Sequence, residues 1–306
     1  MNLDPFYQKN LYGLNSYFDE LVLLFKKTKL PNKILLNGKR GIGKFTLANH
    51  FINYCLSLDE DFSYDVKNYE INDQNHSYKL IINKSSPNLF LIDLNDERKN
   101  IEINQIRNLI DFCNKSNFNS KPRFILINNL EKMNLNSSNA LLKILEEPNE
   151  GIFFILINSS SKILPTIKSR CLSFNISLSS NEILEICSII IGENINQILN
   201  EDFLNYYFSI GDFINIYEFS KMNNINLSNI TLDEFLKIII KEKIYKKETL
   251  ISDLIYNLIE IYYLRNIKTN NTKEYENHIR LVNNTKKFNL DTESIFLKLQ
   301  QNLINE

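Results

Sequence analysis

A glycine-rich loop over residues 38–46 constrains the fold of this chain more than any other feature. Gly38, Gly43 and Lys44 have the G-x-x-x-x-G-K spacing of a Walker A phosphate loop, and Gly41 lies between them. The whole chain has only seven glycines, so their concentration here is not an accident of composition. An apolar strand pattern precedes the loop and an apolar pattern at helical spacing follows it. An ordinary turn between a strand and a helix is the alternative, but this context predicts a phosphate loop.

The loop lacks the residue that should bind magnesium. In such loops backbone N–H groups surround phosphate oxygens, a Lys reaches the outer phosphates, and the next hydroxyl binds Mg²⁺. Phe45 stands at the hydroxyl position, and Thr46 cannot replace it because one helical step rotates the side chain by about 100°. We therefore expect weak or vestigial phosphate binding and no required cofactor. The candidate phosphate-binding residues are Gly38, Gly41, Gly43, Lys44 and Thr46.

A second element of the nucleotide site also lacks the residues that a metal-dependent hydrolase needs. Hydrolases of this type need an apolar strand that ends in Asp-Glu, to hold the metal shell and to polarise the attacking water. Residues 124–127 form such a strand, but Asn128 and Asn129 follow it. Neutral amides attract Mg²⁺ weakly and cannot act as a base. A core strand with a polar end is the alternative, but together with Phe45 the pattern predicts a chain that does not hydrolyse nucleotide.

Composition limits the class of protein. Hydrophobic residues make up 43% of the chain and charged residues 23%, as in globular proteins, and the net charge of −1 implies no global attraction to DNA. The acidic N-terminal region without an apolar core segment predicts no secretory signal, and no apolar run suggests a membrane span. Cytoplasmic location is the expectation. Four scattered cysteines without a C-x-x-C pair predict reduced, mostly buried thiols and no zinc.

The chain divides into an alternating α/β part and a helical part. Apolar strands at 34–36, 89–92, 124–127 and 153–157 alternate with helical patterns near 45–57, 103–115 and 136–147, which predicts a parallel sheet covered on both faces. The acidic, polar segment 59–78 is expected to be an insertion or a surface loop. Beyond residue 170 there is no proline, and amphipathic patterns predict helices. Those patterns comprise Leu236, Ile239, Ile240 and Ile244, then Leu250, Leu254, Leu258 and Ile261, and a closing helix over 296–304.

The longest motifs follow the second site. They are the Asn139–Pro148 stretch with its Leu-Glu-Glu-Pro end, the strand 153–157, Ser159-Ser160, the segment 162–168 and the triplet Ser169-Arg170-Cys171. Together with residues 101–107 they resemble bacterial clamp-loader AAA+ proteins, most closely the delta-prime family of the DNA polymerase III clamp loader. The resemblance covers roughly residues 10–175.

The resemblance implies an architecture and a role. It implies an α/β AAA+ P-loop core over 1–175, a small helical lid over 176–222 and an all-α collar over 223–306. Five subunits, including motor and delta subunits, would form an open ring that places the sliding clamp on primed DNA, with no membrane contact. Delta-prime-like members are the stator of this ring, so no ATPase or polymerase activity of its own is expected.

The resemblance also assigns residues. Arg170, with Ser169 and Cys171, would project toward ATP held by a neighbouring motor subunit, for which a permanently charged, bidentate guanidinium is suited. A turn cap or an ion pair is the alternative role for Arg170. Ser159 or Ser160 would lie at the sensor-1 position, where a hydroxyl senses the γ-phosphate; a plain polar strand end is the alternative. Residues 209–212 lack the sensor-2 Arg of motor subunits, and the family's zinc module is missing between residues 57 and 86.

Two other functions remain as alternatives. The first is an active AAA+ ATPase, either the motor subunit of a clamp loader or another replication-fork ATPase. ATP hydrolysis by the isolated chain, abolished by Lys44→Ala, would favour it. The second is a P-loop nucleotide kinase or a simple DNA-binding module. The Leu-Glu-Glu-Pro and Ser-Arg-Cys stretches have no role in a kinase, and the neutral charge disfavours independent DNA binding.

Overall fold

The computed structural model divides the chain into two compact units, Met1–Glu182 and Ile183–Glu306. The residues that the structure describes are 4–94, 100–116, 118–146, 151–160, 163–204, 208–243, 254–266, 275–277, 279–282, 284 and 296. The proposed three-part division at residues 175 and 222 stays a prediction.

The first unit is built on a five-stranded parallel sheet with the order β2-β3-β4-β1-β5. Its strands are β1 (Lys33–Asn37), β2 (Leu89–Ile92), β3 (Arg123–Ile127), β4 (Ile152–Asn158) and β5 (Leu172–Asn175). The four predicted strands are confirmed, because each is a run of apolar residues enclosed on both faces. β5 was not predicted: it is a short edge strand in which only Phe174 is buried, so it carries no apolar run.

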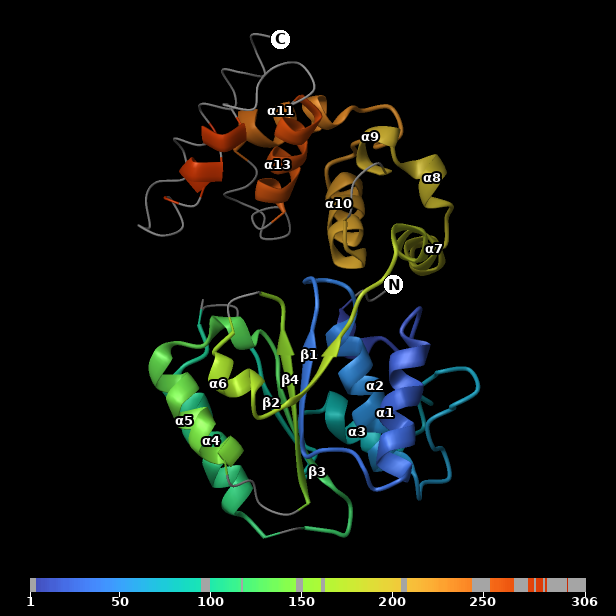
Figure 1. Ribbon diagram of the computed structural model, residues 1–306. Helices are drawn as coiled ribbons and strands as arrows, with labels where there is room; N and C mark the ends of the chain where they lie inside the picture. Colours follow the sequence, from blue (N-terminus) through green and yellow to red (C-terminus); the bar gives the residue numbers. More distant parts are fainter. Residues whose placement is uncertain are drawn as a thin grey trace. The chain divides into compact units, whose positions relative to one another are not determined.

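Helices cover both faces of this sheet (Figure 1). On one side lie α1 (Asn15–Lys26), α2 (Lys44–Ser57) and α3 (His76–Ile82), and on the other α4 (Ile103–Asn114), α5 (Leu135–Glu146) and α6 (Pro165–Lys168). Two short 3₁₀ helices, η1 (Pro5–Tyr7) and η2 (Leu130–Lys132), complete the unit. The predicted α/β core with a doubly covered parallel sheet is therefore confirmed.

Helix α2, which follows the phosphate loop, is buried on nearly all sides. Asn49, His50 and Asn53 are at most 1% exposed, although they lie on the polar side of the helical pattern. The segment 59–78, predicted as a surface loop, helps to enclose this helix: the Tyr64 hydroxyl bonds to Nδ1 of His50 at 2.9 Å. Up to Asn75 the segment contains no helix or strand and most of its residues are exposed, so it is a surface loop there, as predicted. Tyr64 and Ile71 are nevertheless buried, and the last residues begin α3.

The second unit is helical in the residues that the structure describes, as predicted. Its helices are α7 (Ser180–Ile191, which begins in the first unit), α8 (Ile195–Ile198), α9 (Glu201–Leu204), α10 (Ile210–Met222), α11 (Leu232–Lys241) and α13 (Ile255–Asn266). Both predicted apolar faces are buried: Leu236, Ile239 and Ile240 in α11, and Leu258 and Ile261 in α13. Ile244, Leu250 and residues 297–304 lie outside the described residues.

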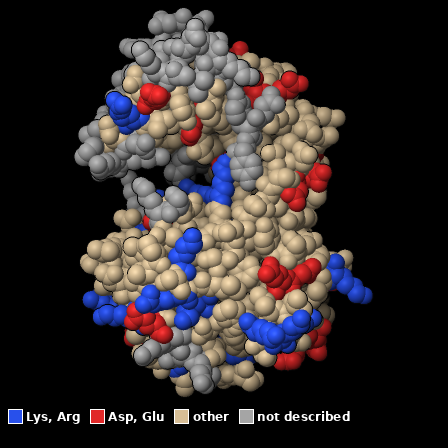
Figure 2. Space-filling view, viewed as in Figure 1, with Lys and Arg blue, Asp and Glu red and all other residues tan. Residues whose placement is uncertain are grey.

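The molecular surface and the cysteines agree with the composition. Lys and Arg are interspersed with Asp and Glu on the face shown in Figure 2, in keeping with the small net charge. Among the described residues, no helix is long and apolar enough to cross a membrane. All four cysteines are free thiols; three of them are buried and Cys171 is partly buried.

Candidate functional site

The phosphate loop leaves the carboxyl end of β1 and leads into α2. Gly38 follows the last residue of the strand, and a Cβ there would lie 2.4 Å from the carbonyl oxygen of Ile176. Gly43 has φ of 93° and precedes the first helical residue, a conformation that favours glycine. Gly38 thus allows the close approach of the Ile176 backbone, and Gly43 allows the tight turn into α2.

Lys44 is turned into its own loop. The residue is only 4% exposed, and its ammonium donates hydrogen bonds to the carbonyl oxygens of Gly38 at 2.8 Å and Lys39 at 2.7 Å. Burial lowers the pKa of Lys44 to about 8, partly opposed by the charge of Glu131. The lysine therefore occupies the inside of the loop and stabilises it with backbone carbonyls. A phosphate group would have to take over these bonds.

The position of the metal-binding hydroxyl is taken up by aromatic packing. Phe45 is half-buried, and its ring centroid lies 6.2 Å from that of Phe6 in η1. The Asn49 amide donates to the Phe6 carbonyl oxygen at 3.3 Å, which holds η1 against α2. Thr46 lies one residue further along the helix. The loop thus has no hydroxyl at the position where Mg²⁺ would be bound.

The second site contains a residue that the sequence did not single out. The side-chain amides of Asn128 and Asn129 both donate to the carboxylate of Asp93, at 2.9 and 2.8 Å. Asp93 directly follows β2, and because β2 and β3 are parallel neighbours, their carboxyl ends meet at one edge of the sheet. The two Asn residues therefore have a specific structural partner.

The sensor-1 region is also occupied by internal bonds. The Ser159 backbone N–H donates to the Glu131 carboxylate at 3.1 Å. Asn158, at the end of β4, is 3% exposed and donates to the Asn37 side chain at 3.0 Å and the Ser160 carbonyl at 2.6 Å. Glu131, which lies in η2, was not anticipated, because it stands two residues beyond the expected acidic pair. The sensor-1 assignment of Ser159 or Ser160 stays a prediction.

The predicted sensor-2 region forms the start of a helix. Ser209 is fully buried and caps α10, accepting from the Asp212 backbone N–H at 3.2 Å, while Asp212 accepts from the Ser209 N–H. These residues form a capping box, which satisfies the free N–H groups of a helix start. Among the residues that the structure describes, no group of three or more His, Cys, Asp or Glu side chains is gathered for a metal ion. The expected absence of zinc stays a prediction.

Arg170 lies at the flank of the sheet and is bonded within its own subunit. Its guanidinium donates to the Thr166 carbonyl at 2.9 Å and to the Glu146 carboxylate at 2.9 Å. Ser169 donates to the same Thr166 carbonyl at 3.1 Å. Cys171 packs against the core beneath α4 and α5, and burial raises its pKa to about 11. In this triplet Cys171 anchors the turn in the core, Ser169 closes the turn, and Arg170 bonds to Glu146 at the surface.

The sheet register separates Arg170 from the phosphate loop of its own chain. Leu172, the first residue of β5, pairs with Ile34 near the start of β1, and Arg170 precedes it in the turn after α6. Gly38 follows the other end of β1. Four residues of strand, from Ile34 to Gly38, correspond to about 13 Å. Arg170 therefore lies near the amino ends of β1 and β5, whereas the phosphate loop follows the carboxyl end of β1.

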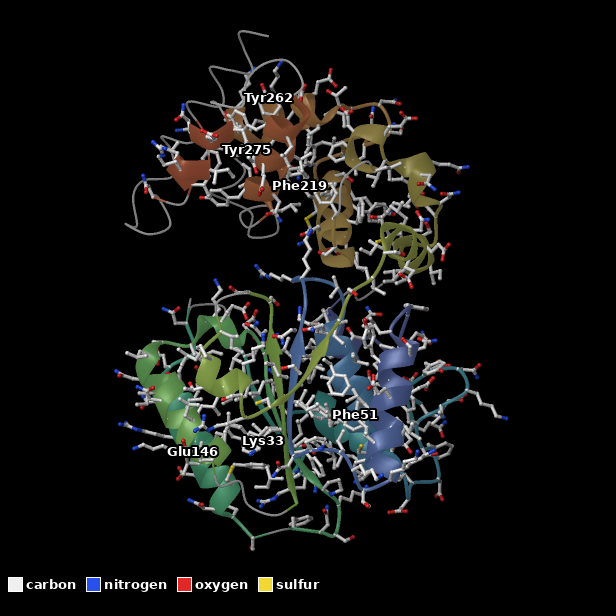
Figure 3. All side chains as sticks on the ribbon, viewed as in Figure 1. Lys33, Phe51, Glu146, Phe219, Tyr262 and Tyr275 are labelled. Carbon is white, nitrogen blue, oxygen red and sulfur yellow. The ribbon has the colours of Figure 1, made fainter. Side chains whose placement is uncertain are left out.

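Lys33 and Glu146 connect this flank to the sheet. Figure 3 labels both residues, on the opposite side of β1 from Phe51 in α2. The Lys33 ammonium donates to the Leu145 carbonyl oxygen at 3.0 Å, at the last turn of α5. Lys33 also partly opposes the rise in the pKa of Cys171. The end of α5 is thereby tied to the start of β1.

Sequence comparisons identify relatives of this chain. A family model described as DNA polymerase III, delta subunit, matches residues 13–180. The delta-prime subunit of Pseudomonas aeruginosa is 33% identical over 138 residues, which are 45% of this chain and 40% of that protein. The delta-prime subunit of Buchnera aphidicola subsp. Baizongia pistaciae is 28% identical over 183 residues, 58% of this chain and 51% of that protein.

Gamma subunits and a solved structure also match. A gamma subunit of Buchnera aphidicola subsp. Acyrthosiphon pisum is 28% identical over 296 residues, 84% of this chain and 79% of that protein. A gamma subunit-related protein of Thermotoga maritima shares 21% identity with a TM-score of 0.44, over 84% of this chain and 74% of that one. The matches span about half the length of the delta-prime relatives. Because the family model covers more than half of the sequence, this chain belongs to the delta-prime family of DNA polymerase III clamp-loader subunits.

Proposed function

We propose that this chain is a non-hydrolysing, delta-prime-like subunit of a DNA polymerase III clamp loader, and that Arg170 acts on ATP bound by a neighbouring motor subunit. Family membership supports the clamp-loader assignment. The observation that carries the specific role is the position of Arg170 before the amino end of β5, whereas its own phosphate loop follows the carboxyl end of β1. A guanidinium at that place serves a nucleotide in another subunit, not its own.

The state of the chain's own loop supports the absence of hydrolysis. A Mg²⁺-dependent reaction needs a hydroxyl and carboxylates around the metal and a base near the attacking water. Here Phe45 packs against Phe6 at the hydroxyl position. Asn128 and Asn129 stand in place of the acidic pair and donate to Asp93. Lys44 is engaged with loop carbonyls, so ATP is not required to hold the loop together.

The flank around Arg170 is suited to an intersubunit contact. β5 is the edge strand of the sheet, and Leu172 beside Arg170 is 42% exposed. A trans arginine stabilises the charge that develops on the transferred phosphoryl group, and is worth about 10³–10⁵ in rate in other systems. The chain would thereby activate a neighbour without reacting itself.

The remaining parts of the proposal follow from the family. We propose that the chain assembles with motor and delta subunits into a hetero-oligomeric, five-membered ring that places the sliding clamp on primed DNA. The helical unit Ile183–Glu306 would supply the lid and the collar contacts of that ring. Replication complexes of this kind work in the cytoplasm, which is the location we propose.

The active-motor alternative has one observation in its favour. The match to a Buchnera gamma subunit extends over 84% of this chain, further than the delta-prime matches. Under the active-motor alternative, the isolated chain must hydrolyse ATP, and Lys44→Ala must abolish this activity. Phe45 at the hydroxyl position and Asn128 and Asn129 in place of the acidic pair favour the non-hydrolysing role.

The test is ATP turnover by the cognate motor complex with clamp and primed DNA, assembled with wild-type chain, Arg170→Ala or Lys79→Ala. We expect Arg170→Ala to lower the rate at the neighbouring ATP site by about 10³-fold. Lys79 is exposed on α3, on the other face of the sheet, so Lys79→Ala is the matched loss of one positive charge. Unchanged turnover in a complex that still assembles with Arg170→Ala would reduce Arg170 to a structural residue.

A further inference from the structure

We propose that Glu146 holds Arg170 on its own subunit, and that ATP in the neighbouring subunit takes the guanidinium from this carboxylate. The inference rests on the proposed trans role of Arg170 and adds a control element to it. Glu146 would then be a positioning residue: it acts through Arg170 and touches no nucleotide.

Arg170 is held on its own subunit by two hydrogen bonds. One terminal nitrogen donates to the Thr166 carbonyl and the other to the Glu146 carboxylate, both at 2.9 Å. A guanidinium has further N–H donors beside these two, so what opposes a phosphate here is charge. Carboxylate and phosphate are both anions, and the Glu146 charge beside Arg170 disfavours the approach of a triphosphate unless the guanidinium leaves the carboxylate.

The position of Glu146 is unfavourable for its helix. It is the last residue of α5, where the partial negative charge of the helix end disfavours a carboxylate. The Lys33 ammonium already binds the Leu145 carbonyl at that end. The helix gains nothing from an acid at this place. Its described partner is Arg170, so the carboxylate is best explained by what it does to that residue.

The ion pair is exposed enough to be exchanged. The side chain of Arg170 is 33% exposed and that of Glu146 is 54% exposed. Pairs at such positions are weak, because water solvates both charges and the side chains lose freedom. The several negative charges of a triphosphate compete well against a single carboxylate. The pair is thus strong enough to order the arginine in the free subunit and weak enough to yield to ATP.

The experiment is a double-mutant cycle on binding. The full-length wild-type chain, Glu146→Gln, Arg170→Ala and the double variant are bound to the cognate motor subunit loaded with adenylyl-imidodiphosphate, and dissociation rates are measured. We expect Glu146→Gln to slow dissociation by about twofold to fivefold, the range for an exposed ion pair. The same change in the Arg170→Ala background should have no effect, and neither should it with nucleotide-free motor subunit.

A matched variant controls for the loss of charge. Glu20→Gln removes one negative charge from the exposed surface of α1, away from Arg170, and is expected to leave the dissociation rate unchanged. Thermal unfolding of each variant checks that the fold is retained.

The outcomes separate the two proposals. If Arg170→Ala changes neither dissociation nor neighbour turnover, the trans role fails and Glu146 has nothing to control. If Arg170→Ala lowers turnover but Glu146→Gln leaves dissociation unchanged, the trans role stands and the proposed exchange is wrong. Faster dissociation of Glu146→Gln, dependent on Arg170, would also overturn it, since the carboxylate would then orient the arginine for its target and not compete with it.

Discussion

At the scale of single residues, the loss of a metal site is accompanied by new bonds. Asn128 and Asn129 could be read from the sequence as neutral replacements of an acidic pair, but not as donors to Asp93, which lies 35 and 36 residues away. Parallel strands bring these residues together, and no local pattern records that contact. The two amides donate hydrogen bonds to the Asp93 carboxylate at the sheet edge, so the polar groups of the altered site satisfy one another.

These hydrogen bonds predict that acidic residues at positions 128 and 129 would destabilise the chain. Asn128→Asp together with Asn129→Asp would replace two donors to Asp93 with two like charges at the same place. We expect the free energy of unfolding at pH 7 to fall by about 2–4 kcal/mol, from lost hydrogen bonds and charge repulsion. Urea unfolding measures it. Adding Asp93→Asn should recover part of the loss; no recovery would show that Asp93 is not the partner that matters.

Lys44 predicts a distinct pH dependence of stability. Its pKa falls from 10.5 to about 8 on folding, so between these values the unfolded chain binds more protons. The contribution of Lys44 to the free energy of unfolding therefore rises as pH increases through this window. Relative to Lys44→Met, wild type should gain up to about 3 kcal/mol from pH 7 to 10.5, at about 1.4 kcal/mol per pKa unit. Parallel pH profiles of the two proteins in denaturant titrations would contradict burial of the charged lysine.

At the scale of elements, hydrophobic periodicity predicted the strands and helices that bury a regular apolar face. It missed the elements and contacts that have no such face. β1 to β4 and helices α2, α4 and α5 were predicted within one or two residues, because apolar runs and spacing mark them. β5 has a single buried residue and no such pattern. The segment 59–78 is acidic, yet it is ordered by side-chain bonds between distant residues. Arg170 and Glu146 likewise meet only in the fold.

The bonds of Glu60 predict how that segment is held. Its carboxylate accepts from the Lys121 ammonium at 2.7 Å and from the Ser77 N–H and hydroxyl. Burial would raise the pKa of Glu60, but these hydrogen bonds outweigh it and lower the pKa below its ordinary value. The stabilisation is therefore present above the unfolded pKa near 4.5 and is lost as the pH falls below it.

Glu60→Gln should accordingly cost about 1–3 kcal/mol of unfolding free energy at pH 7, and the difference from wild type should shrink in acid. Denaturant titrations at pH 7 and below pH 4 measure it. Asp73→Asn is the matched control, because Asp73 pairs with Lys9 at an exposed site, with side chains 63% and 42% exposed. That change should stay within about 0.5 kcal/mol. Equal losses for both variants would contradict a special role of Glu60.

At the scale of the whole molecule, the two compact units predict a division of labour. The residues 1–182 contain the sheet, both altered site elements and Arg170, and they form one compact unit. A fragment of these residues should unfold cooperatively, seen by circular dichroism, because its core is complete. We expect it not to stimulate the motor subunit at concentrations where the full chain does, since the proposed ring contacts lie in the second unit. Full stimulation by the fragment would contradict a required collar.

The contact between Phe45 and Phe6 bears on how such a subunit evolves. A change to Ser or Thr at residue 45 would supply the missing hydroxyl, but it would also remove one of the two described aromatic rings that contact Phe6, the other being Tyr7. Removing aromatic packing costs stability at once, whereas a lone hydroxyl without an acidic pair restores no activity. A return to hydrolysis at this position is therefore opposed by folding before catalysis could reward it.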